Sequence, residues 1–97
     1  MGVMLPGSFK PAGFVTIALA TDNPSSIAPP AGCSGALIQA SGGNVAWRDD
    51  GVAPTSGSGG GMLLIDGNDP SWFSGDLTVI QFIAVGASTA LLVAYYA

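Results

Sequence analysis

The charged residues of this chain gather in one short segment, and they are its first candidates for chemistry. Arg48, Asp49 and Asp50 stand together and are followed by Gly51 and Pro54. Glycine has a free φ and proline fixes φ near about −65°, so segment 47–55 predicts the end of a strand and a turn. Two neighbouring carboxylates could serve acid–base chemistry or bind a hard cation through oxygen ligands.

A second acidic group, Asp66, Asn68 and Asp69, could also supply oxygen ligands for calcium. Adjacent strand residues point to opposite faces, so Asp49 and Asp50 converge only if the turn brings them together. We therefore interpret both groups as solvated turn residues and predict no metal site.

Arg48 is one of only two basic residues, beside six acidic ones. In a chain with so few charges we expect its guanidinium to pair with Asp49, with Asp50 or with a carboxylate of a neighbouring subunit.

The remaining inventory excludes most catalytic classes. The chain has no histidine, and its single cysteine, Cys33, has no partner for a disulfide, which excludes catalytic triads, Cys-His dyads and most transition-metal sites. The glycine-rich run 57–61 lacks the Lys-Ser/Thr ending of a phosphate loop and precedes a strand. We expect no enzyme, no cofactor, and a small buried role for Cys33.

Aromatic residues offer one further possibility. Trp47, Trp72, Phe73, Tyr95 and Tyr96 could form a platform on which sugars or bases stack. In a small β domain such residues more often belong to the core and to interfaces. A free carbohydrate- or ligand-binding β module remains an alternative.

The composition points to an assembly. The 97 residues suffice for one domain, with 48% hydrophobic and 8% charged residues, where soluble proteins carry about 25% charged residues. A surface so poor in charge is expected to be covered by partner subunits. The net charge of −4, with two separated bases, argues against nucleic acid as a partner.

The elements that position these residues are short strands. Residues 1–12 resemble an extended arm, which holds Phe9 and Lys10, and residues 13–97 form the domain. Strands are predicted over 14–20, 26–30, 33–40, 44–48 and 62–66, with 33–40 and 44–48 paired as a hairpin. With the last two strands, this predicts an all-β fold, a small antiparallel β-sandwich or jelly roll of seven to eight strands without a helix longer than a turn.

Residues 77–97 carry no charge and are long enough to cross a bilayer of about 30 Å. Gly86-Ala87-Ser88 splits them into two strand-length runs, 77–85 and 89–96, and no basic residue lies close by to orient a helix. We predict a buried hairpin rather than a membrane span. Residues 1–10 lack an apolar core of signal-peptide length, so no secretion signal is expected.

Alternation along the strands predicts which side chains face the core. The inward set is Val15, Ile17, Leu19, Ile38, Leu63, Ile65, Ile80, Phe82, Leu91 and Val93. A second face of the last strands is also apolar, with Leu77, Val79, Ile83, Val85, Leu92 and Ala94. An apolar second face implies that another molecule or segment covers it.

Segments along most of the chain resemble a known family. They are 26–32 (SIAPPAG), 36–40 (ALIQA), 44–55 (NVAWRDDGVAPT), 61–64 (GMLL), 77–83 (LTVIQFI) and 91–96 (LLVAYY). In this order they are similar to small β-sandwich structural proteins of tailed bacteriophages, among them capsid decoration or cement proteins. The resemblance covers residues 26–97 and brings no catalytic residues. The Ser-Gly insert at 56–60 and the Trp72-Phe73 link depart from the pattern.

The resemblance implies a protein of the phage head that oligomerises and binds the major capsid protein to stabilise the shell. A head–tail connector, tail or fibre-base protein is the alternative in the same setting. Partners would be other virion subunits, with neither nucleic acid nor membrane among them. The candidate interface residues are Phe9, Lys10, Arg48, Trp72, Phe73 and Tyr96.

Overall fold

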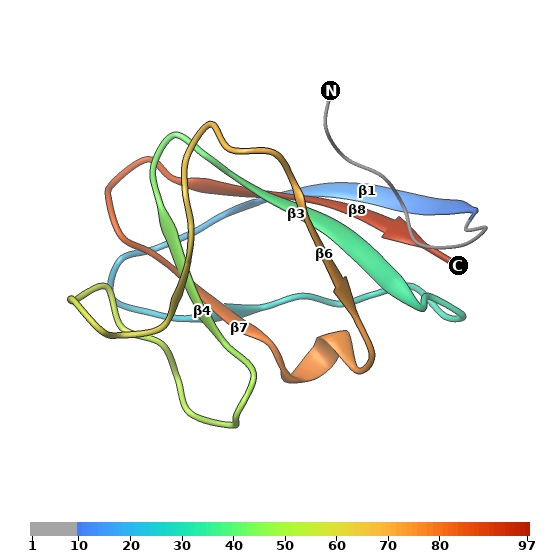
Figure 1. The fold of residues 1–97 in the computed structure, drawn as a ribbon, viewed down its shortest axis with the longest axis horizontal. Coiled ribbons are helices and arrows are strands. Elements are labelled where there is room, and N and C mark those ends of the chain that lie inside the picture. Colours follow the sequence, from blue (N-terminus) through green and yellow to red (C-terminus); the bar gives the residue numbers. More distant parts are fainter. Residues whose placement is uncertain (1–9) are drawn as a thin grey trace.

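The computed structural model describes residues 10–97, which form two four-stranded antiparallel sheets (Figure 1). Sheet A has the strand order β1-β8-β3-β6, and sheet B has the order β2-β7-β4-β5. The strands are β1 (Pro11–Ala18), β2 (Ser25–Ser26), β3 (Gly35–Ser41), β4 (Val45–Arg48), β5 (Met62–Leu64), β6 (Ser71–Ser74), β7 (Gln81–Ala84) and β8 (Ala90–Tyr96). A three-residue 3-10 turn, η1 (Leu77–Val79), is the one helical element of this part of the chain. The all-β prediction is confirmed.

The strand pairing is that of a jelly roll. β1 pairs with β8, β2 with β7, β3 with β6 and β4 with β5, so the chain is one long hairpin of four nested strand pairs. The additional pairs β3–β8 and β4–β7 join these nested pairs into two sheets. Folding a long hairpin over itself in this way gives the double-sheet jelly roll. The predicted sandwich of seven to eight strands is confirmed, with eight strands present.

The two predicted hairpins are wrong, because each pair of strands is divided between the sheets. β3 lies in sheet A and β4 in sheet B, and likewise β8 lies in sheet A and β7 in sheet B. The connections at 42–44 and 85–89 are therefore corners between sheets. A Cβ atom on Gly42 would lie 2.5 Å from the carbonyl oxygen of Ser88, so glycine is required where the two corners touch.

The charge-free segment 77–97 is also not two simple strands. The Asp76 carboxylate accepts a hydrogen bond from the Thr78 amide at 3.1 Å and caps η1, which leaves only Gln81–Ala84 as strand β7. Leu77, expected on the second face, is 2% exposed and packs in the core. Among residues 10–97, no helix is long and apolar enough to cross a membrane.

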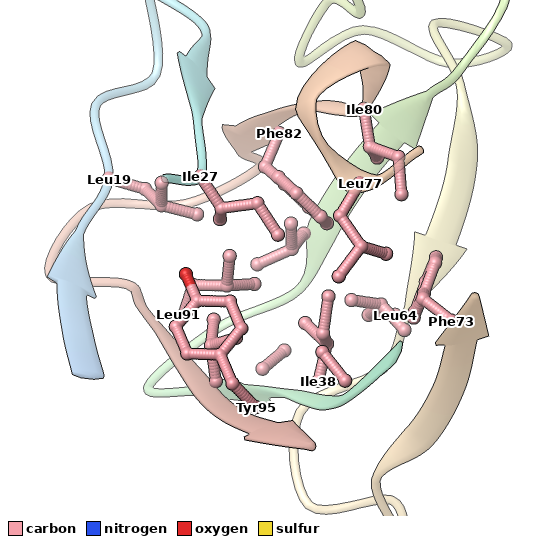
Figure 2. Packing of buried hydrophobic residues seen from close by; sticks show 14 of the residues in the cluster. Leu19, Ile27, Ile38, Leu64, Phe73, Leu77, Ile80, Phe82, Leu91 and Tyr95 are labelled. Carbon is pink, nitrogen blue, oxygen red and sulfur yellow. The ribbon is translucent and has the colours of Figure 1, made fainter. Parts of the chain in front are cut away.

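The core lies between the two sheets, where side chains from both meet (Figure 2). Six of the predicted core residues are buried, and Val15 and Ile17 pack against them; the six are Leu19, Ile38, Ile80, Phe82, Leu91 and Val93. Leu63 and Ile65 were predicted inward and are 55% and 41% exposed. The register places Leu64, not its neighbours, opposite the fully buried Val45, so the alternation of β5 is shifted by one residue.

The N-terminal end of the described chain is tied to the C-terminus. Strand β1 begins at Pro11, inside the predicted arm, and the backbone of Lys10 exchanges hydrogen bonds with Ala97 at 3.1 and 2.8 Å. The rest of the predicted arm, residues 1–9 with Phe9, lies outside the described residues.

Candidate functional site

The outer face of sheet A is apolar where a jelly roll normally meets water. Alternation along each strand sends Val15, Ile38, Phe73 and Val93 towards the core, so their neighbours point outward. We call this surface the sheet A face; it consists of Phe14, Thr16, Leu37, Gln39, Trp72, Leu92, Ala94 and Tyr96. Phe14 pairs with Ala94, which pairs in turn with Leu37, so apolar side chains run across three strands.

A protruding ring and a hollow stand next to each other on this face. The Phe14 side chain is 66% exposed, the largest exposure of any bulky apolar residue among residues 10–97. Beside it lies a shallow hollow of about 110 Å³, lined by Phe14, Leu37, Gln39, Pro70, Leu92 and Ala94. The Gln39 amide nitrogen donates to the carbonyl of Asn68 at 3.1 Å, which occupies one of its donors. The floor of the hollow is therefore mainly apolar.

An aromatic pair occupies the other end of the sheet A face. The rings of Trp72 and Tyr96 lie 6.0 Å apart, tilted by 51°. A Cβ atom on Gly35 would lie 2.5 Å from Cη2 of Trp72, so the indole rests on the bare backbone of Gly35. Both rings are half-buried in the isolated chain. Glycine thus allows the tryptophan to lie against the sheet rather than stand away from it.

No charged residue occurs in β1, β3, β6 or β8, the four strands of sheet A. All six aspartates of the chain stand outside the strands. With a net charge of −4, the protein therefore carries its negative charge in the connections between strands. The sheet A face is a surface on which contact with another apolar surface desolvates no ion.

The centre of the outer face of sheet B is covered by the chain itself. Phe82 and Ala84 face the core, so Ile83 between them points outward, yet Ile83 is only 3% exposed and its strand partner Ala46 only 2%. The β4–β5 loop, residues 49–61, supplies the cover: Pro54 is fully buried, and loop residues 56–59 line one hollow together with Ala46. The loop therefore covers the centre of this face, whereas Leu63, the strand partner of Ala46 on β5, stays 55% exposed.

Close backbone approaches hold the β4–β5 loop in place. The Thr55 amide donates to the carbonyl of Gly60 at 3.0 Å, and the Gly60 amide donates to the carbonyl of Gly57 at 3.0 Å. A Cβ atom on Gly61 would lie 2.8 Å from the carbonyl oxygen of Trp47. The glycine-rich run is thus a closed turn whose glycines permit tight packing.

Arg48 pairs with Asp50, one of the predicted partners. Its Nε donates to Oδ1 of Asp50 at 3.0 Å and its Nη2 donates to Oδ2, while the Val52 amide donates to Oδ1 at 3.3 Å. The guanidinium lowers the pKa of Asp50 from 3.8 to about 2, and the same hydrogen bond raises the pKa of Arg48. The pair is exposed and fixes the start of the β4–β5 loop. The charged segment is thus a structural corner.

An open hollow of about 420 Å³ lies beside this ion pair. It is lined by Trp47, Arg48, Asp49, Asp50, Gly59, Gly61 and Met62. The indole of Trp47 is packed edge-on against Phe73 at 5.0 Å between ring centroids, which holds it at the wall of the hollow. The volume lies within the range of small-molecule sites. It combines one aromatic ring with carboxylates, the elements of a sugar-binding surface.

The second acidic turn is occupied by backbone contacts. Oδ1 of Asp66 accepts from the Gly42 amide at 3.2 Å, and the Asp66 amide donates to Oδ1 of Asn44 at 2.9 Å. Asp66 thus fastens the turn after β5 to the corner after β3. Within residues 10–97, no group of three or more His, Cys, Asp or Glu side chains is arranged to hold a metal ion.

The candidate interface residues are distributed over different parts of the molecule. Trp72 and Tyr96 come together on the sheet A face, and Lys10 is exposed at the end of β1. Phe73 is 9% exposed in the core and offers no surface, which corrects its assignment. Arg48 lies in sheet B, and Phe9 falls outside the described residues. Cys33, expected to be buried, is half-buried and donates through Sγ to the carbonyl of Gly35 at 3.2 Å.

Sequence reasoning did not select Phe14 and Leu37, the residues at the centre of the sheet A face. The sequence does contain an indication of this face, because apolar residues such as Phe14 and Leu37 stand on the outward side of the strands. These residues form one surface only because β1, β8 and β3 are neighbours in one sheet, which the sequence pattern does not reveal. Comparisons of the chain with protein-family models, with curated proteins and with solved structures found no significant match.

Proposed function

We propose that this protein is a structural component of a tailed-bacteriophage virion, a decoration or cement protein that oligomerises and binds the major capsid protein to stabilise the head. The proposed role is non-enzymatic and requires no cofactor. One observation carries it: the four strands of sheet A contain no charged residue, and their outer face exposes Phe14 at 66%. An apolar face of this kind is suited to permanent contact with other subunits.

Three features support the assignment. The jelly roll is an architecture found in viral capsid domains, although a fold alone does not define a function. The resemblance of segments between residues 26 and 97 to phage structural proteins gives the setting. Arg48 and Asp50 of the charged segment pair with each other. Together they favour a scaffold role over chemistry.

The test is binding to shells. We expect the purified protein to sediment with empty shells assembled from the major capsid protein encoded near its gene, and to raise the temperature at which those shells fall apart. Leu37→Asp should abolish co-sedimentation because it places a charge in the middle of the sheet A face. Val79→Asp, at a residue 45% exposed in η1 of the described chain, is the matched control. Co-sedimentation of the Leu37→Asp variant equal to that of the unmodified chain would contradict the proposed surface.

Binding to isolated tails or connectors, with none to shells, would favour a head–tail connector, tail or fibre-base protein. The same surface would serve there, since both roles need an apolar contact with other subunits.

The hollow beside Trp47 favours a second candidate function, a free carbohydrate- or ligand-binding module. In that case the hollow of about 420 Å³ would take a sugar ring against the indole, with Asp49 accepting from its hydroxyls. A glycan array, followed by titration of Trp fluorescence, would reveal such binding. Trp47→Ala should then abolish binding, and Met62→Ala should weaken it less.

A further inference from the structure

Two turns of this chain contain an aspartate that is followed directly by a glycine. They are Asp50-Gly51, at the start of the β4–β5 loop, and Asp66-Gly67, in the turn after β5. All four residues are exposed, and the two glycines have similar positive φ values, 82° and 85°. The two dipeptides therefore share sequence, exposure and backbone form, and they differ in what holds the aspartate side chain.

An Asp-Gly dipeptide can rearrange without an enzyme. The glycine amide nitrogen attacks the aspartate Cγ, the new C–N bond closes a five-membered succinimide ring, and the carboxyl hydroxyl leaves with the amide proton as water. Water then opens the ring at either of its two carbonyls. Opening at the main-chain carbonyl routes the backbone through the side chain and gives isoaspartate, so the net change is an isomerisation that needs only water. Glycine favours it because no Cβ hinders the attack.

The attacking amide is available in both turns. Within residues 10–97, neither the Gly51 amide nor the Gly67 amide lies in a strand or donates a hydrogen bond. The hydrogen bond that closes the turn after β5 runs from the Asn68 amide to the carbonyl of Ile65 at 3.1 Å, which leaves the amide of Gly67 unengaged. The two carboxyl groups therefore decide which turn reacts.

The carboxylate of Asp50 is fixed at both oxygens. Arg48 donates from Nε to Oδ1 at 3.0 Å and from Nη2 to Oδ2, and the Val52 amide donates to Oδ1 at 3.3 Å. This two-point contact opposes rotation of the carboxyl group towards the Gly51 amide. It also lowers the pKa of Asp50 from 3.8 to about 2, so the neutral carboxyl that loses water is rarer at neutral pH by roughly one to two orders of magnitude.

The carboxylate of Asp66 is held by one neutral contact. Its Oδ1 accepts from the Gly42 amide at 3.2 Å, and no cationic side chain of the described chain pairs with it. A single hydrogen bond from a neutral amide is weaker than the charge-assisted pair at Asp50. The carboxyl group of Asp66 is therefore the freer of the two to turn towards the glycine that follows it.

We propose that isoaspartate forms spontaneously at Asp66-Gly67, and that Arg48 protects Asp50-Gly51 from the same reaction. The modification does not depend on the proposed function, and its test uses the purified full chain alone. It gives the exposed ion pair at the start of the β4–β5 loop a chemical role besides its structural one. A subunit that stays in a permanent assembly would accumulate the change with age.

Ageing of the purified chain at neutral pH, below its melting temperature, measures the two rates. Peptide mapping by mass spectrometry locates isoaspartate through its enzymatic methylation and its resistance to a protease that cleaves before aspartate. We expect isoaspartate to accumulate at residue 66 at least about tenfold faster than at residue 50. Equal rates at the two sites, or no isoaspartate at residue 66, would overturn the proposal.

Removing the guanidinium tests the protection. Arg48→Met should raise the rate at Asp50 at least about tenfold, because it frees the carboxyl group and restores its neutral form. Asp66 in the same molecule is the matched control, and its rate should not change. An unchanged rate at Asp50 would overturn the protective role of Arg48. Equal increases at both sites would overturn it as well, because they would arise from a general loosening of the fold.

A second variant tests the reaction at Asp66 itself. Asp66→Glu keeps the charge, but its longer side chain would have to close a six-membered ring, so the modification at this residue should disappear. The isomerised fraction of the unmodified chain should melt at a lower temperature, because the longer backbone disturbs the hydrogen bonds that join Asp66 to Gly42 and Asn44. Rearrangement at residue 66 in Asp66→Glu at the rate of the unmodified chain would overturn the succinimide route.

Discussion

The outer faces of the two sheets are both rich in apolar residues, but these residues differ in how far they are exposed in the structure. Both carry apolar residues where the strands of a sandwich normally present polar ones: Ile83 and Ala46 in sheet B, Phe14 and Leu37 in sheet A. The centre of sheet B is covered by the β4–β5 loop, in which Pro54 is fully buried. The sheet A face has no such cover among the described residues and leaves Phe14 66% exposed.

The difference teaches that an apolar outer face is not by itself evidence of a partner. On sheet B, a loop of the same chain, the thirteen residues 49–61, covers the centre of the apolar face. On the other side, Phe14 on the outer face of sheet A stays 66% exposed. The sheet A face is therefore the stronger candidate for contact with another subunit, and the comparison can be tested on both sides.

The largest effect is expected from truncating the covered face. Ile83→Ala should lower the free energy of unfolding by about 2–5 kcal/mol, because it leaves a cavity under the β4–β5 loop. Phe14→Ala removes a larger side chain from the open face and should change it by less than about 0.5 kcal/mol in the monomer. Urea denaturation at a concentration where the chain is monomeric measures both. Equal losses for the two variants would show that the faces do not differ.

A smaller effect is expected from lifting the loop. A Cβ atom on Gly60 would lie 2.8 Å from the carbonyl carbon of Thr55 and closer still to its oxygen, so Gly60→Ala should cost about 1–3 kcal/mol. Gly57→Ala is the matched control, because its Cβ would come no closer than 4.0 Å to Thr55. Hydrogen exchange at Ala46 and Ile83 should rise in the first variant and not in the second. Unchanged exchange in Gly60→Ala would argue against the loop as the cover.

How far the sequence predicts these features depends on the range of the interactions. Alternation and turn residues predicted the strands, the all-β class and most of the core, because each depends on a few neighbouring residues. The failures at Leu63 and Ile65 came from one shift of register, which is fixed by pairing with β4. The two false hairpins arose because Gly42 serves a contact between corners rather than a tight turn.

The candidate site was predicted in part for the same reason. Trp72 and Tyr96 were selected as aromatic residues, and they do meet on the sheet A face. Phe73 is adjacent in sequence to Trp72 and points into the core, which becomes evident only once β6 is known to pair with β3. The cover over sheet B depends on how residues 49–61 fold back, which composition does not encode.

The aromatic end of the sheet A face offers a third test. Gly35→Ala should push the Trp72 indole away from the sheet, because the new Cβ would lie 2.5 Å from Cη2. The expected loss is about 1–2 kcal/mol, with a change in Trp fluorescence as the ring becomes more exposed. Gly86→Ala, where a Cβ would meet nothing within 4 Å, is the control. An unchanged spectrum for Gly35→Ala would show that the ring does not rest on Gly35.

The smallest effect concerns the ion pair at the start of the covering loop. The pKa of Asp50 is lowered from 3.8 to about 2 by Arg48, so the folded state binds this proton less tightly than the unfolded chain. The contribution to stability is therefore present above about pH 4 and is lost as the pH falls through about 2. Because both groups are exposed, salt should weaken it.

Removing the guanidinium isolates this contribution. Arg48→Met should raise the pKa of Asp50 towards 3.8, as measured by NMR titration of its carboxyl carbon. Asp49→Asn is the control and should leave that pKa low, because the hydrogen bonds that lower it come from Arg48. Binding to shells through the sheet A face should be unaffected by Arg48→Met, since the pair lies with sheet B. Weaker binding to shells in this variant would instead connect the charged corner to the interface and contradict the assignment of the sheet A face.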